Sequence, residues 1–295
     1  MGIRFGASGA SDSFYAEKKQ RSSLEMPQWL RERGLNAFEY QCGHGVRIGL
    51  ETAAKLGALA REHDVLLSLH APYYINLSGA DPEKLAKTKN YLLDSLRAAQ
   101  AMQAVTVVFH PGSAAKIERR EALARAKRFM REILAEVRAE GLDHIALAPE
   151  TMGKKNQLGT LEEVLELCEI SPQLRPAVDF GHIHALTGGS LTDKAAFARL
   201  LDLINTRLGP AYLQNLHVHF SPIEFTAGGE KKHWTTLETH IGPDFAPLAE
   251  LLAERKLTPV IICESAGRQA EDAVVYRELY HKYYRELTPV INKNE

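Results

Sequence analysis

Eight short apolar segments recur along this chain, and each is followed by a segment with helical character. The apolar segments are residues 3–5, 37–40, 65–69, 104–109, 145–149, 174–178, 213–216 and 259–263. They are too uniformly apolar for a sheet with one solvated face, so they predict parallel strands that are covered on both sides. Eight such strand–helix units predict a closed (β/α)8 TIM barrel of the α/β class, with an open doubly wound sheet as the alternative.

The segments between these strands have helical spacing and helix-terminal signals. The expected helices span residues 24–33, 46–63, 82–100, 119–140, 160–170, 192–208, 245–255 and 271–285. Thr160 with Glu163 three residues later forms a capping-box pattern at the start of one of them. Residues 6–11 and the polar stretch from about 218 to 244 are expected to be loops.

Composition limits the kind of protein this is. The chain has 295 residues, of which 45% are hydrophobic and 25% charged, and no break in composition marks a linker. We therefore expect one domain over residues 1–295. A net charge of -1 excludes a global field that would attract nucleic acid. Three separated cysteines, no secretory segment and no apolar run of about 20 residues indicate a cytoplasmic protein without a membrane span.

Metal-capable side chains follow six of the eight strands directly. These strand-end residues are His70, His110, Glu150, Asp179, His217 and Glu264. The carboxyl ends of parallel barrel strands meet at one face, so these side chains are expected to converge at the C-terminal face of the barrel. A single histidine or aspartate at a strand end is usually a hydrogen-bonded structural residue. Six at equivalent places are a poor fit to chance and predict a metal site.

The number and type of these ligands indicate more than one ion. Mixed imidazoles and carboxylates suit Zn²⁺, and Mn²⁺ or Fe²⁺ as well. A catalytic zinc usually takes three protein ligands, so six residues predict at least two ions, bridged by a carboxylate. Two neighbouring ions stabilise both oxygens of an in-line phosphoryl displacement. His182 and His233 are candidate ligands of a further ion. His184 and His219 each lie two residues past a candidate ligand and are candidates for a supporting role.

Several of these motifs together resemble endonuclease IV, a family of metal-dependent apurinic/apyrimidinic (AP) endonucleases within the xylose isomerase-like barrels. The resemblance covers essentially the whole chain. It rests on residues 70–77 (HAPYYINL), on 150–153 (ETMG) with 156–159 (NQLG), on Asp179 with His182, and on Glu264 followed by Ser265. It implies cleavage of double-stranded DNA 5′ to abasic sites in base excision repair, by a metal-bound hydroxide.

The resemblance also implies a role for each ligand. His70 and His110 would hold one zinc ion, and Glu150 would bridge it to a second. Asp179, His217 and Glu264 would complete the second site, and His182 with His233 would belong to a third, so that two to three ions are expected. Glu150 and Glu264 would be the catalytic carboxylates. No protein partner is inferred, and a monomer is expected.

Two loops depart from the family pattern. The third-zinc motif of the family is Asp-x-His, whereas Lys231 and Lys232 precede His233 here. Lysine cannot replace a carboxylate ligand, so Glu230 is the substitute, provided that a helical turn brings it to the face of His233. The family places an arginine in the loop after the second strand, and residues 41–45 (QCGHG) lack one. Tyr73 matches the aromatic residue that enters DNA, although a packed aromatic at the barrel rim explains it equally well.

Three functions fit these features. The first is an AP endonuclease, which a basic rim would assist: Lys154, Lys155, Lys231, Lys232 and Arg268 lie on loops at the ligand end. The second is a sugar or sugar-phosphate isomerase or epimerase with one ion on the same barrel, since the fold alone does not separate the two. The third is a nucleic-acid or metal-binding protein without catalysis, which the complete ligand set disfavours.

Overall fold

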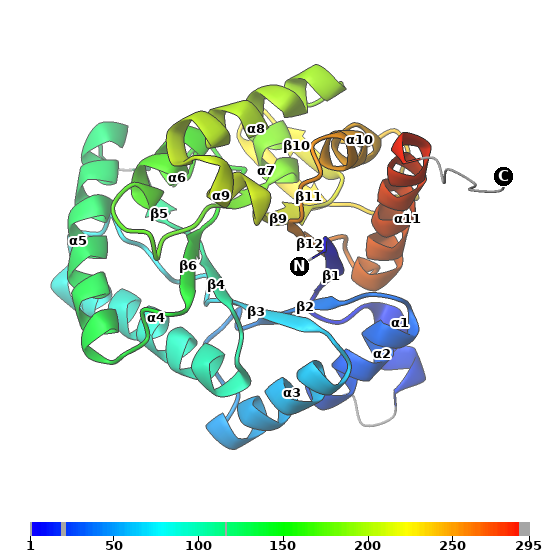
Figure 1. The fold of residues 1–295 in the computed structure, drawn as a ribbon. Helices are drawn as coiled ribbons and strands as arrows, with labels where there is room; N and C mark the ends of the chain where they lie inside the picture. The colour runs from blue at the N-terminus through cyan, green and yellow to red at the C-terminus, as the bar shows by residue number, and fades with distance from the viewer. Residues whose placement is uncertain (1, 19–21, 116, 289–295) are drawn as a thin grey trace, which may run out of the picture.

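The structure is a computed structural model that describes residues 2–18, 22–115 and 117–288, and its centre is an eight-stranded parallel barrel (Figure 1). The barrel strands are β1 (Arg4–Ser8), β2 (Ala37–Gln41), β3 (Leu66–His70), β4 (Thr106–Phe109), β6 (Ala146–Pro149), β8 (Ala177–Asp179), β9 (His217–Phe220) and β12 (Val260–Cys263). They pair in chain order, with β12 returning to β1. Bridges from Leu147 to Leu174 and from Glu150 to Ala177 join β6 to β8 and close the ring.

Helices surround the strands on the outside (Figure 1). They are α1 (Asp12–Glu17), the 3-10 turn η1 (Ser23–Glu25), α2 (Met26–Glu32), α3 (Leu50–Glu62), α4 (Pro82–Met102), α5 (Arg119–Ala139), α6 (Leu161–Cys168), α7 (Phe180–Leu186), α8 (Lys194–Leu208), α9 (Pro210–Gln214), α10 (Ala246–Glu254) and α11 (Gln269–Leu287). The predicted capping box is confirmed, because the Thr160 hydroxyl accepts from the Glu163 N–H and the Glu163 carboxylate accepts from the Thr160 N–H.

The barrel and its single-chain (β/α)8 order confirm the predicted fold, but several boundaries differ. The seventh strand was predicted at 213–216, and this is wrong: α9, with Pro210 at its first position, runs to Gln214, and β9 starts only at His217. The first strand runs on through Gly6 to Ser8, where a loop was expected. The polar stretch before residue 244 contains an antiparallel hairpin of β10 (Ile223–Thr226) and β11 (Gly229–His233).

Alternation along β9 decides which of its side chains face the barrel interior. Phe220 is fully buried and packs on Phe245 and Tyr276, with ring centroids 4.9 and 5.3 Å away. These partners belong to the outer layer around α10 and α11, so Phe220 faces outward. Successive side chains of a strand point to opposite faces, so His217 and His219 both point into the barrel. In β2 the same alternation sends Glu39 inward, because Phe38 packs in the outer apolar core.

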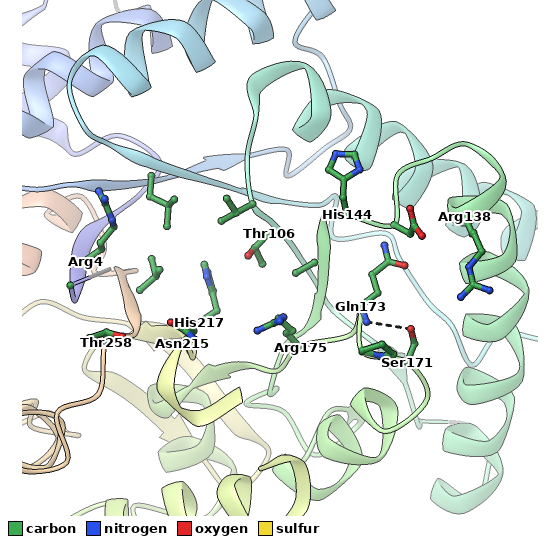
Figure 2. A pocket seen from close by; sticks show the side chains of 17 residues that line it. Arg4, Thr106, Arg138, His144, Ser171, Gln173, Arg175, Asn215, His217 and Thr258 are labelled. Atoms are coloured by element: carbon green, nitrogen blue, oxygen red, sulfur yellow. Dashed lines mark hydrogen bonds between the residues drawn. The ribbon is translucent and has the colours of Figure 1, made fainter. Parts of the chain in front are cut away.

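Each mouth of the barrel has a cavity. The cavity at the N-terminal mouth has a volume of about 560 Å³, and Thr106 and His217 lie on it together with Arg4 and Arg175 (Figure 2). The cavity at the C-terminal mouth, of about 450 Å³, contains most of the predicted ligands. The larger cavity is therefore at the opposite end from the predicted chemistry. Among the described residues, no helix combines the length and apolar character that a membrane crossing requires.

Gly57 provides a test of how tightly the outer layer packs. A Cβ atom at this position of α3 would lie 2.3 Å from the carbonyl oxygen of Met102, which is backbone and cannot move aside. We expect Gly57→Ala to lower the free energy of unfolding by about 1–3 kcal/mol, measured by urea denaturation of the protein. Gly79→Ala is the matched control, because its Cβ would make only ordinary contacts, the nearest at 3.6 Å. Equal stability of the two variants would contradict this packing.

Candidate metal centre

The carboxylate of Glu150 is the centre of a buried cluster of histidines at the C-terminal mouth. Its Oε2 lies 3.2 Å from His70 Nε2 and 3.1 Å from His110 Nε2. Its Oε1 lies 3.1 Å from His219 Nδ1 and 3.4 Å from His182 Nδ1. These imidazoles come from β3, β9, α7 and the segment after β4, so only the closed barrel brings them to one carboxylate.

Three groups of possible ligands meet around this carboxylate. Within each group, one ligand atom per residue lies within 4.8 Å of all the others. The groups are His70, His110 and Glu150; Glu150, Asp179, His219 and Glu264; and His182, Glu230 and His233. Glu150 belongs to two of them, which is the arrangement expected of a bridging carboxylate. The predicted residues His70, His110, Glu150, Asp179, His182, His233 and Glu264 are thus brought together.

His217 is the exception among the predicted residues. It was expected to join Asp179 and Glu264, but His219 takes that place in the structure. The reason is the shift of the seventh strand: His217 is the first residue of β9 rather than the residue after its end, so it lies deeper in the barrel. His217 lines the cavity at the N-terminal mouth instead (Figure 2). The repeat His-Val-His leaves both choices open in the sequence, and only the strand register decides between them.

Asp179 links two of the groups through the helix that follows it. It ends β8 and caps α7, where its Oδ1 accepts a hydrogen bond of 2.7 Å from the backbone N–H of His182. His182 lies in the first turn of α7. The His182 Nδ1 atom is 2.9 Å from the Thr151 carbonyl oxygen, and Nε2 faces Glu230 Oε2 at 3.5 Å.

The third group depends on a bulge in the β10–β11 hairpin. Glu230 was expected to reach the face of His233 through a helical turn, and that local structure is wrong. Glu224 pairs with Lys232 and Phe225 with Glu230, so Lys231 is the extra residue that puts Glu230 and His233 on the same side. Their side chains approach to 3.8 Å. The Glu230 N–H donates to the Gly153 carbonyl at 2.9 Å, which docks the hairpin on the loop after β6.

Buried charges of both signs set the electrostatics of the cluster. The pKa of Asp179 is raised to about 6, mainly by burial, with His182 acting to lower it and Glu264 and Glu150 acting to raise it. Burial would also raise the pKa of Glu150, but His219 and the other imidazoles hold it well below its usual range. For His219, burial acts to lower the pKa, yet Glu39, Glu264 and Glu150 bring it well above the usual value.

The donor set fits divalent metal ions. The Oδ2 atom of Asp179 is buried and has no hydrogen-bond partner among the residues that the structure describes. Such an atom is costly unless a cation or a donor reaches it. Imidazole nitrogens and carboxylate oxygens are the ligands that zinc, manganese and iron prefer. The cluster therefore has the composition, the spacing and one orphaned oxygen that a metal centre requires.

Sequence reasoning missed three residues around this cluster. Glu39 in β2 is completely buried and lies 2.9 Å from His217 and 3.0 Å from His219. Ser8 donates to Glu264 Oε1 at 3.0 Å, and Gln41 donates to Ser8 at 2.7 Å. The available signal was a carboxylate inside the apolar run 37–40, which is unusual in a buried strand. Ser8 was hidden because the first strand was predicted to end too early.

Tyr73 covers the outer side of the first group. Its ring lies over the ring of His110, with centroids 5.5 Å apart and planes at 27°, and it is 5.7 Å from His70. The residue is nonetheless 51% exposed at the rim of the cavity. Packing against the histidines and contact with a substrate are both compatible with this position, so both interpretations given to the sequence remain.

The cluster predicts an unusual pH dependence for the metal-free protein. Burial opposes the charged form of His182, but Asp179, Glu150 and Glu230 raise its pKa well above the usual value of about 6.5. A raised pKa stabilises the fold fully below about pH 6.5, and that stability is lost as the pH rises through the folded-state pKa. His219 acts in the same direction.

We therefore expect the melting temperature of chelator-treated protein to fall as the pH rises above about 6.5, since protons then leave both imidazoles. Added Zn²⁺ should remove most of this dependence, because the ion replaces the protons as the positive charge. Differential scanning calorimetry with and without the ion measures both. A metal-free protein that is as stable above this pH as below it would contradict the prediction.

Comparisons with known proteins agree with this geometry. A model of the xylose isomerase-like TIM barrel family matches residues 27–283. An uncharacterized protein of Methanocaldococcus jannaschii is 31% identical over 86% of this chain and 90% of its own length. A probable endonuclease 4 of Mycoplasma pneumoniae is 26% identical over 74% of this chain and 75% of its own.

Two solved structures have the same fold at low identity. Endonuclease IV from Thermus thermophilus superposes with a TM-score of 0.68 at 20% identity, over 96% of this chain and 99% of its own. A D-tagatose 3-epimerase-like protein gives a TM-score of 0.70 at 21% identity, over 97% and 99%. The family match, with several relatives named probable endonuclease 4 and an endonuclease IV among the similar structures, confirms the expected relationship. This chain belongs to the xylose isomerase-like TIM barrel family.

Proposed function

We propose that this protein is a metal-dependent phosphodiesterase that cleaves double-stranded DNA 5′ to abasic sites, as the endonuclease IV resemblance implies. The observation that carries the proposal is the presence of three ligand groups rather than one, with Glu150 common to two of them. Carbonyl chemistry on a sugar needs only one ion. A phosphodiester has an attacking oxygen, a leaving oxygen and a charged phosphate to stabilise, which is the task of several neighbouring ions.

The residues of the chain have distinct roles in this proposal. Zinc ions held by the three groups would activate water near neutral pH and neutralise charge on the phosphate. Glu264 is held in place by the Ser8 hydroxyl, so its second oxygen remains free to act at the cavity. Tyr73 would stack on the exposed face of a deoxyribose or a base beside the gap that a missing base leaves. Glu150 and Glu264 are the catalytic carboxylates of this proposal.

Fewer basic side chains are available at the rim of the ligand cavity than the sequence suggested. The Lys231 ammonium lies 2.6 Å from Glu224, and that of Lys232 lies over the Trp234 ring at 4.0 Å. Both ammonium groups are thereby held against other residues of the same segment. Lys154 lies on the cavity with its ammonium 4.0 Å from Glu230, and Lys155 is exposed on the same loop. These two lysines are the ones that we expect to contact DNA phosphates, since their charge is placed beside the ligand groups.

A sugar epimerase is the second candidate, and one observation favours it. Glu150, Asp179, His219 and Glu264 form a four-residue group that could serve a single ion by itself. The likeness to a D-tagatose 3-epimerase-like structure is as high as that to endonuclease IV, although at this identity it concerns the fold alone. On this alternative the first and third groups would have no assigned task.

Incision of a defined DNA substrate separates the two candidates. The substrate is a duplex oligonucleotide with one tetrahydrofuran abasic analogue, and the enzyme is metal-analysed protein. We expect a single cut 5′ to the lesion, leaving a 3′-hydroxyl, that EDTA pretreatment abolishes and Zn²⁺ restores. Glu264→Gln should lose at least about a hundredfold in rate without loss of the fold, because it removes a charged ligand and no core volume.

The control is the same protein offered ketoses, with epimer formation followed by chromatography. Fully metal-loaded protein that leaves the abasic duplex intact but epimerises a ketose would overturn the nuclease proposal in favour of the second candidate. Incision by Glu264→Gln at the wild-type rate would instead remove that residue from the mechanism.

Lys154 and Lys155 are tested through the salt dependence of DNA binding. Each phosphate contact contributes about 0.9 to the slope of log affinity against log salt, so Lys154→Ala with Lys155→Ala should reduce the slope by about one to two. Fluorescence anisotropy with the abasic duplex measures it. The matched control is Lys231→Ala with Lys232→Ala. It removes the same charge, but from side chains that are held by Glu224 and by the Trp234 ring. Equal slopes for both double variants would contradict the assignment of the phosphate contacts to Lys154 and Lys155 alone.

A further inference from the structure

Glu39 is a buried carboxylate on which several donors converge inside the barrel. It is 0% exposed and lies in the middle of β2, one layer below the candidate metal centre. Ser68 Oγ donates to its Oε2 at 2.8 Å, and His217 Nε2 lies 2.9 Å from the same oxygen. Gln41 Nε2 donates to Oε1 at 3.3 Å. Burying a carboxylate in such a place is unfavourable in free energy unless both of its oxygens have hydrogen-bond donors or positive charge beside them.

The fourth neighbour of Glu39 is His219, whose two ring nitrogens face different groups. Nδ1 lies 3.1 Å from Glu150 and 3.5 Å from Glu264, within the ligand cluster. Nε2 lies 3.0 Å from Glu39 Oε1, off the line of an N–H hydrogen bond, so among the described residues it has this close contact but no hydrogen-bond partner. A neutral imidazole carries one proton, and the partner of one nitrogen decides which nitrogen is left to bind a metal.

We propose that Glu39, held in turn by His217, is the positioning residue that keeps the proton of His219 on Nε2 and so presents Nδ1 as the metal ligand. The inference rests on the metal centre of the proposed function, not on its DNA substrate. It gives Glu39 and His217 a shared role that neither the ligand groups nor the family match assigns.

The register of the strands explains why this support is available. His217 and His219 alternate on the inner face of β9, with ring centroids 5.3 Å apart, so one carboxylate reaches both. Glu39 projects from β2 across the barrel interior and meets them with its two oxygens. His217 also lines the cavity at the N-terminal mouth (Figure 2). The contacts His217–Glu39–His219–Glu150 therefore run through the barrel from one mouth to the other.

The same three residues also lie close enough to hold an ion themselves. The donors around Glu39 favour a hydrogen-bonded carboxylate instead. Ser68 and Gln41 use the same oxygens as acceptors, so an ion would have to displace both.

Metal affinity tests the proposal without reference to DNA cleavage. Zinc affinity is measured for each site by competition with a chromophoric chelator, and Co²⁺-loaded protein is compared by visible absorption. We expect Glu39→Gln to weaken one ion by about 10- to 100-fold and to alter the Co²⁺ spectrum, leaving the other ions in place. Glu39→Asp, which retains the charge, should recover part of the affinity. His217→Gln should give a smaller loss, because it acts through Glu39.

Glu163→Gln is the matched control. Glu163 is also a buried carboxylate, with structural partners Arg119 and the Thr160 N–H, and it has no contact with the cluster. It should reduce stability while every ion binds as in the wild type. Wild-type zinc affinity and Co²⁺ spectrum in Glu39→Gln would overturn the proposal. It would also be overturned by an additional ion that both Glu39→Gln and His217→Gln lose, since that identifies the residues as ligands.

The two proposals fail separately. A weakened ion in Glu39→Gln supports the positioning role even when the wild-type protein does not cut abasic DNA, in which case only the substrate assignment is lost. Wild-type protein that binds no divalent metal at all overturns both, because the positioning role then has nothing to position.

Discussion

The contact between the Glu150 carboxylate and the imidazoles around it is the interaction on which the rest of the site depends. A carboxylate with 1% exposure is unfavourable by several kcal/mol unless opposite charge or donors surround it. The surrounding histidines come from different strands, a helix and the segment after β4, so satisfying this one group requires the whole ring to close in register. The barrel supports the cluster, and the cluster in turn constrains where each strand of the barrel can end.

Protonated histidines do not neutralise the carboxylates of the cluster well. Asp179 has its pKa raised to about 6 and one oxygen without a hydrogen-bond partner among the described residues, while His182 and His219 have their pKa values raised by neighbouring carboxylates. Such opposed pKa shifts among adjacent groups are common in functional sites. Divalent cations resolve the imbalance by replacing protons as the positive partners. The same argument applies to Glu39, deeper in the barrel, where two histidines and a hydroxyl stabilise the carboxylate in place of a cation.

The sequence predicted the architecture and most of the cluster because both follow from strand ends. An apolar run that stops at a histidine or carboxylate is visible without coordinates, and the barrel then brings all such ends together. What failed depended on register or on local geometry. His217 and His219 are two residues apart in one strand, so a start four residues later exchanged their roles. Glu230 was named for a helical turn, but a bulge at Lys231 is what aligns it. Glu39 points inward from the middle of a strand, where no strand-end rule applies.

The most direct test of the account is a crystal structure of the zinc-loaded protein with anomalous difference maps at the zinc absorption edge. The account predicts peaks within the three ligand groups, with Glu150 shared between two of them and Nδ1 of His219 as a ligand. It also predicts that no peak lies among Glu39, His217 and His219. A single peak confined to Glu150, Asp179, His219 and Glu264 would contradict the multi-ion centre. A peak coordinated by His217 would contradict the placement of the seventh strand's ligands.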